Sequence, residues 1–224
     1  MWHMSIILCL CLTSAAQAQT APSADEIARY SGLHRAAQDG DIPAIRHLVA
    51  QGADLNARDT AGRTPAHVAA FASNDDALMA LAAAGADMNA LEDGIYDVLT
   101  IAAVANDPHM VSLALDLGNR PDLVTSVYDG TALIAAAHLG HHEVVRRLIE
   151  GGAPLDHVNN LGWTALIEAV ILGDGGPDHV QTVQYLVDGG ADLSITDRDG
   201  VTALRHAEGR QYGLIAEIIT AGGE

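Results

Sequence analysis

Residues 62–70 read Gly-Arg-Thr-Pro-Ala-His-Val-Ala-Ala, and residues 85–90 read Gly-Ala-Asp-Met-Asn-Ala. Thr64 suits a helix N-cap, because its hydroxyl can accept a hydrogen bond from a backbone N–H that has no partner inside the helix. Pro65 suits the first helical position, where its fixed φ is already helical and no N–H is needed. Gly85 suits the left-handed position that ends a helix and turns the chain. The stretch therefore predicts a pair of helices followed by a reversal of the chain.

The same phrase returns along the chain with a period near 33 residues. The glycines that close the units are separated by 33, 33, 34, 38 and 32 residues, and they are Gly52, Gly85, Gly118, Gly152, Gly190 and Gly222. One core position moves in the same register and holds Leu48, Leu81, Ala114, Leu148, Leu186 and Ile218. The N-cap position holds Asp97, Thr131, Thr164 and Thr202 in the later units. A repeat of this length predicts a solenoid in which each unit packs on its neighbours.

The repeated phrase closely resembles the ankyrin repeat, whose units run Gly-x-Thr-Pro-Leu-His-x-Ala-Ala and close with Gly-Ala-Asp-x-Asn. The resemblance covers residues 24–223 and implies an all-α solenoid of about six helix-turn-helix repeats with projecting hairpin loops, the last repeat being incomplete. We expect residues 19–30 to form an N-terminal segment and the start of a capping helix, with residues 24–31 extending the first helix of repeat one. The ankyrin-repeat domain then spans 31–223, with repeats at approximately 31–59, 60–92, 93–125, 126–159, 160–198 and 199–223.

Residues 1–18 are a different kind of sequence. Ser5 to Leu12 form a short apolar run, and Ala16-Gln17-Ala18 matches the small-residue pattern at which a secretory signal peptide is cleaved. We therefore predict a signal peptide over residues 1–18 and a periplasmic or secreted mature protein; the alternative is a buried apolar N-terminal helix. Both cysteines, Cys9 and Cys11, lie in this leader, so the mature chain would contain no disulfide.

The charge of the chain limits its partners. The formal net charge is −18, and all eleven basic side chains are arginines. A surface of this sign repels phosphate backbones and anionic lipid headgroups. We therefore expect another protein as the partner, no nucleic acid, and no membrane insertion once the signal peptide is removed.

Two groups of histidines attract attention. Imidazole is a ligand type for zinc or copper, and three histidines lie close together in the sequence: His138, His141 and His142. Residues 140–145 also match the usual ankyrin sequence at the turn between the two helices of a repeat. A metal site at these three histidines is thus one interpretation, and its absence is the other. His34 and His67 occupy the repeat's own histidine position, where the resemblance implies that they tie adjacent units by hydrogen bonds.

The fifth unit is longer than the others. Residues 173–179 read Gly-Asp-Gly-Gly-Pro-Asp-His, and about five extra residues are expected to lengthen the loop between its two helices. This loop is either a flexible, tolerated insertion or a recognition loop that would use Asp174, Pro177 and Asp178.

The hairpin loops are expected to project like fingers near residues 58–63, 91–96, 125–130, 159–163 and 196–200. Aromatic and arginine side chains anchor many protein interfaces, and the candidates on these fingers are Arg63, Tyr96, Tyr128, Trp163 and Arg198. Each ring has an alternative role, which is to pack against the adjacent finger.

No nucleophile elbow, phosphate-binding loop or Cys–His pairing occurs in the sequence, so we expect no catalytic residue and no cofactor. The chain is similar to small exported, periplasmic ankyrin-repeat proteins of Gram-negative bacteria. That resemblance implies a protein-binding scaffold in the cell envelope that supports or inhibits a client enzyme. The alternatives are a metal-binding or metal-delivery protein and a secreted effector.

Overall fold

The computed structural model describes residues 20–223, and the predicted signal peptide lies outside these residues. Within this range the chain forms thirteen α-helices, which are α1 (Ala24–Arg29), α2 (Gly32–Asp39), α3 (Ile42–Ala50), α4 (Pro65–Phe71), α5 (Asp75–Ala83), α6 (Val98–Val104), α7 (Pro108–Asp116), α8 (Ala132–Leu139), α9 (His142–Glu150), α10 (Ala165–Ile171), α11 (Pro177–Asp188), α12 (Ala203–Gly209) and α13 (Gly213–Gly222).

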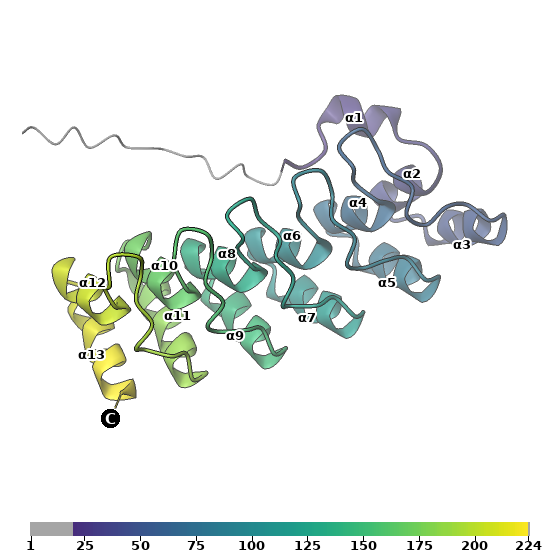
Figure 1. Cartoon of the computed structure of the whole chain (residues 1–224). Helices are drawn as coiled ribbons and strands as arrows, with labels where there is room; N and C mark the ends of the chain where they lie inside the picture. Colours follow the sequence, from purple (N-terminus) through teal and green to yellow (C-terminus); the bar gives the residue numbers. More distant parts are fainter. Residues whose placement is uncertain (1–19, 224) are drawn as a thin grey trace, which may run out of the picture.

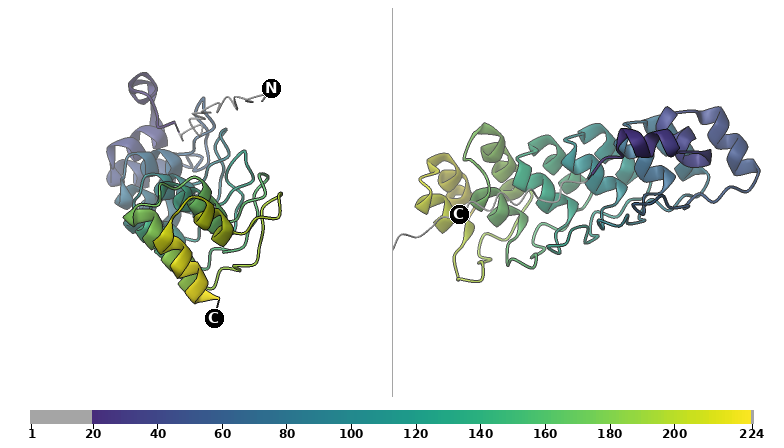
Figure 2. Two further views of the ribbon diagram at one scale, coloured as in Figure 1. Left: turned by 90° about the vertical axis from the view of Figure 1, so that its left-hand side faces the viewer. Right: turned by 90° about the horizontal axis from the view of Figure 1, so that it is seen from above.

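The helices from α2 onward form six antiparallel pairs that stack side by side (Figure 1). The first helix of each pair lies in one row and packs on the first helix of the next pair; the second helices form a parallel row. The loops that join one pair to the next all project from one side of the stack (Figure 2). The expectation of an all-α solenoid with projecting loops is therefore confirmed.

The first helix of each pair begins where the cap residues predict. The Asp97 carboxylate accepts a hydrogen bond from Thr100 N at 2.8 Å. Thr164 Oγ1 accepts one from Ile167 N at 3.2 Å in the same geometry. Thr64 precedes α4, and Pro65 is its first helical residue. These bonds satisfy N–H groups that have no partner within the helix, so each unit starts at a fixed residue.

The glycines that close the first five units adopt a left-handed conformation, with φ between 81° and 98°. This conformation turns the chain out of the second helix and toward the next finger. Gly222 is the exception, because it lies inside α13.

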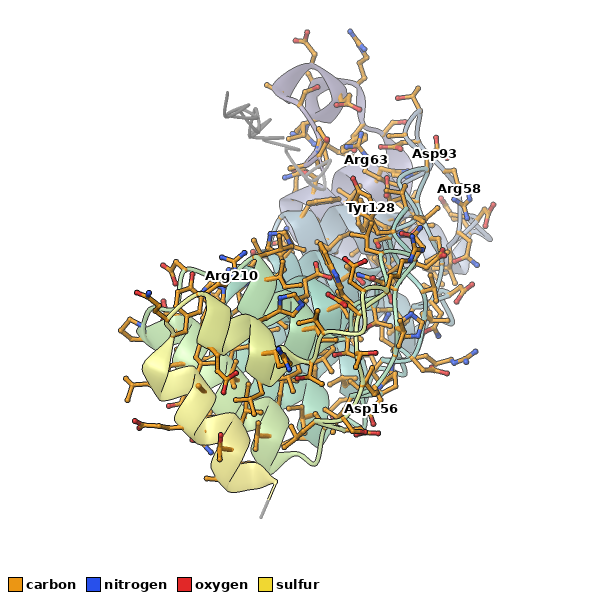
Figure 3. All side chains as sticks on the ribbon, turned by 60° about the vertical axis from the view of Figure 1, so that its left-hand side comes forward. Arg58, Arg63, Asp93, Tyr128, Asp156 and Arg210 are labelled. Carbon is orange, nitrogen blue, oxygen red and sulfur yellow. The ribbon has the colours of Figure 1, made fainter. Side chains whose placement is uncertain are left out.

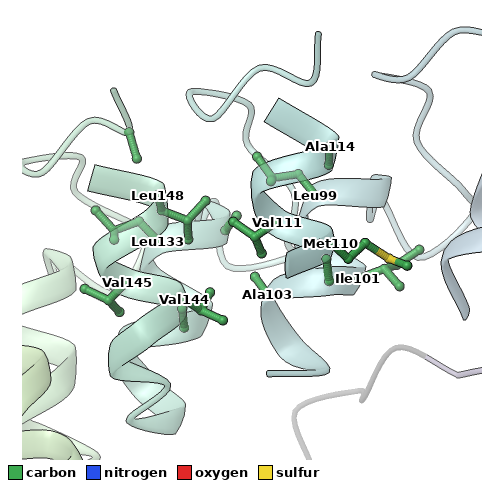
Figure 4. Packing of buried hydrophobic residues seen from close by; sticks show 14 of the residues in the cluster. Leu99, Ile101, Ala103, Met110, Val111, Ala114, Leu133, Val144, Val145 and Leu148 are labelled. Atoms are coloured by element: carbon green, nitrogen blue, oxygen red, sulfur yellow. The ribbon is translucent and has the colours of Figure 1, made fainter. Parts of the chain in front are cut away.

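The core runs continuously through the stack. Figure 4 shows its central part, between Leu99 and Leu148. Leu81, Ala114, Leu148 and Leu186, which share one position of the repeat, are completely buried. The equivalent Leu48 and Ile218 are only half-buried. The difference follows from their place in the stack, since the first and last units each lack one neighbouring unit.

Residues 24–31 do not extend the first helix of repeat one, so that expectation is wrong. Helix α1 ends at Arg29, Tyr30 and Ser31 are extended, and α2 begins at Gly32, whose φ is +56°. Ser23 and Glu26 form a capping box at the start of α1, which fixes it as a separate helix.

The extra residues of the fifth unit are divided between two elements. The loop between α10 and α11 spans residues 172–176, whereas the turn between α8 and α9 spans only 140–141. Helix α11 has 12 residues, whereas α9 has 9. The loop is longer, as expected, but part of the insertion lengthens α11 instead, because Pro177 starts the helix early.

None of the helices between residues 20 and 223 is both long and apolar enough to cross a bilayer.

Candidate protein-binding surface

Each of the five expected loops folds back on itself as a hairpin. We call them finger 1 (58–63), finger 2 (91–96), finger 3 (124–130), finger 4 (158–163) and finger 5 (196–201). One backbone hydrogen bond of 2.8–3.0 Å closes each of them: Asp59 N to Arg63 O, Glu92 N to Tyr96 O, Thr125 N to Gly130 O, Asn159 N to Trp163 O and Asp197 N to Val201 O.

A side chain at the base also holds the finger in shape. Asn159 Oδ1 accepts hydrogen bonds from both Leu161 N and Trp163 N at 3.0 Å. The carboxylates of Asp59 and Asp197 each accept two backbone N–H hydrogen bonds from their own finger in the same way. Since these bonds are internal to each finger, the shape of the finger does not depend on a partner.

Hydrogen bonds tie finger 1 to finger 2, finger 3 to finger 4, and finger 4 to finger 5. Asp93 N donates to Ala61 O at 3.1 Å, which joins fingers 1 and 2. Asn160 N donates to Tyr128 O at 2.8 Å, which joins fingers 3 and 4. The guanidinium of Arg198 donates to Asn160 O and so connects finger 5 to finger 4. The result is a preformed surface along the loop side of the stack.

Arg63 does not lie on that surface, and the prediction that it is an exposed contact residue is wrong. Its side chain is 2% exposed. Arg63 Nε donates to Asp59 Oδ2 at 2.8 Å, and Nη2 forms an ion pair with Glu26. Residues 20–30 fold over finger 1, and the carbonyl of Thr20 also accepts from Arg63, at 3.3 Å.

The carboxylates around Arg63 have shifted pKa values. Burial alone raises the pKa of Asp59, but hydrogen bonds from Arg63 and Tyr30 outweigh it and lower this pKa. Hydrogen bonds from Ser23, and then from Arg63, lower the pKa of Glu26. Both groups are therefore held as carboxylates beside the buried guanidinium.

The other four predicted contact residues divide into two kinds. Tyr96 and Trp163 are half-buried and pack against the core, whereas the alternative interpretation placed each ring against the adjacent finger. Tyr128 is 42% exposed, and Arg198 is also exposed. That any of them binds a partner stays a prediction.

Apart from Tyr128, sequence reasoning missed the apolar component of this surface. Between residues 20 and 223, five of the nine exposed large hydrophobic side chains lie on fingers 3 and 4. We call them the apolar strip: Val124, Val127, Tyr128, Val158 and Leu161. A signal was available for two of them. Val124 and Val158 stand at the start of fingers 3 and 4, where finger 1 has Arg58 and finger 5 has Thr196.

An open groove of about 480 Å³ continues the surface beyond finger 4. Leu161, Trp163 and Ile171 supply its apolar side, and Arg198 and Arg210 supply cations. His206 also lines it and is held by Asp197, with 2.7 Å between His206 Nε2 and Asp197 Oδ2. Such a groove can receive a side chain of a bound protein.

The three histidines proposed as metal ligands bind three different partners. His138 Nδ1 lies 3.2 Å from Glu168 Oε1, and His141 Nδ1 lies 3.0 Å from the carbonyl oxygen of Ala103. His142 Nδ1 lies 3.5 Å from Asp178 Oδ1. No group of three His, Cys, Asp or Glu side chains in residues 20–223 is placed to hold one metal ion.

His34 and His67 tie adjacent units, as expected. His34 Nε2 lies 2.9 Å from Arg63 O, and His67 Nε2 lies 3.1 Å from Tyr96 O. Each bond joins a first helix to the finger of the following unit.

The loop of the fifth unit is anchored to its surroundings. The Asp174 carboxylate accepts from Gly176 N at 2.8 Å and lies 3.0 Å from His179 Nδ1. Pro177 begins α11, and Asp178 is exposed. These contacts hold the loop in an ordered turn. That the loop serves in recognition stays a prediction.

Comparison with known proteins agrees with this geometry. Residues 8–94 and 99–197 match the family description Ankyrin repeats (3 copies). The ankyrin repeat protein YahD of Escherichia coli (strain K12) is 33% identical over 190 residues, which cover 84% of this chain and 94% of that protein.

Two solved structures extend the comparison. An ankyrin repeat domain from Acinetobacter baumannii AYE is 40% identical, with a TM-score of 0.78 over 85% of this chain and 97% of that one. The ankyrin repeat domain of Bcl-3, a member of the IkappaB protein family, is 29% identical, with a TM-score of 0.77 over 87% of each chain.

Proposed function

Because this chain belongs to the ankyrin-repeat family, we propose that it is a non-catalytic scaffold of the bacterial cell envelope that binds a client protein on fingers 3, 4 and 5. Ankyrin repeats generally mediate protein–protein interaction, and proteins built from them are typically scaffolds without enzymatic activity. The observation that carries the proposal is the apolar strip, because large hydrophobic side chains gathered on one exposed surface mark interaction sites.

The mechanism is recognition by a preformed surface. The internal and cross-finger hydrogen bonds fix fingers 3, 4 and 5 before a client arrives, so little conformational entropy is lost on binding. The apolar strip supplies buried area, and the groove beside Trp163 offers a place for an anchoring side chain. Under this proposal the client is an envelope enzyme that the scaffold supports or inhibits.

The location is part of the proposal and rests on the leader. The apolar run and the Ala-Gln-Ala pattern support export, with Gln19 as the first residue of the mature protein. N-terminal sequencing of the protein from a periplasmic fraction and from culture medium tests this. Recovery from the medium alone would favour a secreted effector, and an intact Met1 in the cytoplasm would contradict export.

Binding is tested by crosslinking and co-purification from a periplasmic extract. The wild type is compared with a Val127→Ser, Tyr128→Ser, Leu161→Ser variant. The control is a Met79→Ser, Leu214→Ser variant, which removes exposed apolar side chains on α5 and α13 instead. All proteins are checked for folding by circular dichroism.

A client held by the wild type and the control but lost from the finger variant supports the proposal. A client that is retained by all three proteins places binding elsewhere on the stack. Failure of the wild type to retain any protein would contradict the scaffold function itself.

A further inference from the structure

Four exposed carboxylates lie close to the apolar strip in sequence or on the fingers next to it. Asp129 follows Tyr128 directly, and Asp156 precedes Val158 by two residues, and both are exposed. Asp93 and Asp199 are exposed on fingers 2 and 5. None of these four carboxylates takes part in an ion pair within residues 20–223. Figure 3 shows Asp93, Tyr128 and Asp156 on the side from which the loops project, away from Arg210.

Two arginines lie near the strip, and in the described part of the chain only Arg120 of the two is paired with a carboxylate. Arg120 Nη2 lies 2.8 Å from Asp122 Oδ2, and both residues come shortly before Val124. The guanidinium of Arg198 donates to the carbonyl of Asn160 on finger 4. The carboxylates near the apolar strip therefore outnumber the arginines near it, and the net charge of −18 has the same sign.

From this arrangement we propose that fingers 3 and 4 bind a protein segment in which apolar side chains are flanked by lysine or arginine. The inference rests on the proposed scaffold function and specifies the chemistry of the client. The apolar side chains of the segment cover the apolar strip, and the flanking cations meet Asp93, Asp129, Asp156 and Asp199. Apolar burial supplies most of the affinity, and the charges supply orientation and a faster encounter.

The same charges argue against other occupants. Nucleic acid and anionic lipid surfaces are repelled by these carboxylates. A second copy of this chain carries the same carboxylates on the same fingers, so two such faces repel each other. A client segment rich in Asp or Glu is disfavoured for the same reason.

The test is a selection of random peptides displayed on phage against the mature chain (residues 19–224). Sequences that also bind the Val127→Ser, Tyr128→Ser, Leu161→Ser variant are removed by counter-selection. Peptides that remain are synthesised, and their affinity is measured for the wild type, the finger variant and an Asp93→Asn, Asp129→Asn, Asp156→Asn variant. The Met79→Ser, Leu214→Ser protein is the control.

The proposal expects enriched peptides that combine apolar residues with Lys or Arg. Their dissociation constants should rise on the order of tenfold on the finger variant and severalfold on the Asn variant, and remain unchanged on the control. Raising the salt concentration should weaken binding to the wild type but have little effect on the Asn variant.

Two results would overturn the inference. Enriched peptides that are neutral or acidic yet depend on the apolar strip would refute the basic-segment chemistry and leave the scaffold function standing. Self-association of the wild type through the strip, detected by light scattering and abolished in the finger variant, would make a second copy the occupant. If no selected peptide depends on the strip and co-purification also fails, both proposals are wrong.

Discussion

The Nε2 atom of His67 lies 3.1 Å from the carbonyl oxygen of Tyr96, while the Nδ1 atom of the same ring lies 3.1 Å from Thr64 N. A carbonyl only accepts and a backbone N–H only donates, so Nε2 must carry the hydrogen and Nδ1 must be free of one. The neutral imidazole is therefore the form that fits. Burial of the ring lowers the pKa of His67 to about 4 in accordance with this geometry.

The first prediction is that His67 makes the protein sensitive to acid. In the unfolded chain the pKa of histidine is near its ordinary value of about 6.5, so between that pH and about 4 the unfolded chain binds more protons than the folded one. Stability is complete above this window and falls as the pH is lowered through it. The loss should reach roughly 3 kcal/mol at its acidic end.

Urea unfolding measured across this window checks the first prediction, with His67→Gln as the comparison. Glutamine can donate to Tyr96 O but does not titrate, so its stability should change less with pH. Equal pH dependence in both proteins would show that His67 is not the titrating group.

The second prediction concerns the buried Arg63. Replacing it by methionine leaves Asp59 and Glu26 without their cation, and we expect a loss of about 3 kcal/mol of unfolding free energy. Arg35→Met is the matched control, because Arg35 forms an exposed i,i+4 pair with Asp39 that contributes roughly 0.3–0.5 kcal/mol.

Thermal unfolding and hydrogen exchange of residues 20–30 measure the effect of Arg63→Met. Exchange in this segment should become faster in Arg63→Met and stay unchanged in Arg35→Met. Similar losses of stability in the two variants would contradict the role assigned to the buried pair.

The third prediction separates two glycines by backbone conformation. Gly85 has a φ of +98°, which an alanine adopts only under strain, so Gly85→Ala should lower stability by about 1 kcal/mol. Gly209 ends α12 without a positive φ, and an added Cβ there meets no atom within 4 Å. Gly209→Ala should raise stability by roughly 0.5 kcal/mol. Chemical denaturation of both variants gives the two signs, and a shared sign would count against the conformational argument.

The fourth prediction concerns Asp97, a buried N-cap residue. Burial raises its pKa, although hydrogen bonds from Thr100 and Asn119 oppose the rise. Asp97→Asn keeps an acceptor for Thr100 N and removes the buried charge, so its stability at neutral pH should equal or exceed that of the wild type. Asp97→Ala loses the cap and should cost about 1 kcal/mol.

The pH dependence at Asp97 is opposite in sign to that at His67. Because the folded-state pKa of Asp97 is raised, its contribution to stability is greatest below the ordinary aspartate pKa and declines as the pH rises through the folded-state value. The difference between Asp97→Asn and the wild type should therefore shrink on acidification. Calorimetry of the two proteins at neutral and acidic pH measures it; a gap that widens toward acid would refute the assignment.

Local signals account for most of what the sequence predicted correctly. Thr164 caps α10, Gly85 turns the chain, and His34 and His67 join units, because each role depends on one residue and its near neighbours. The burial of Leu148 could be predicted because its position recurs in register along the repeat.

The errors arise from contacts between distant parts of the chain. Arg63 is buried because residues 20–30, which belong to no repeat, fold over finger 1 and bring Glu26 to it. Nothing in the repeat pattern indicates this contact. The apolar strip was missed for another reason, since Val124 and Val158 are apolar at positions where burial cannot be read from periodicity.

The stacking of each helix pair on the pairs before and after it has a mechanical consequence. Each repeat contacts only its neighbours, so the loss of one interface between repeats need not unfold the others, and local unfolding begins at the two end repeats. A client bound across fingers 3, 4 and 5 would stabilise the repeats of the C-terminal half against local unfolding. Proteases should then cleave the complex from its ends, while the repeats covered by the client stay intact.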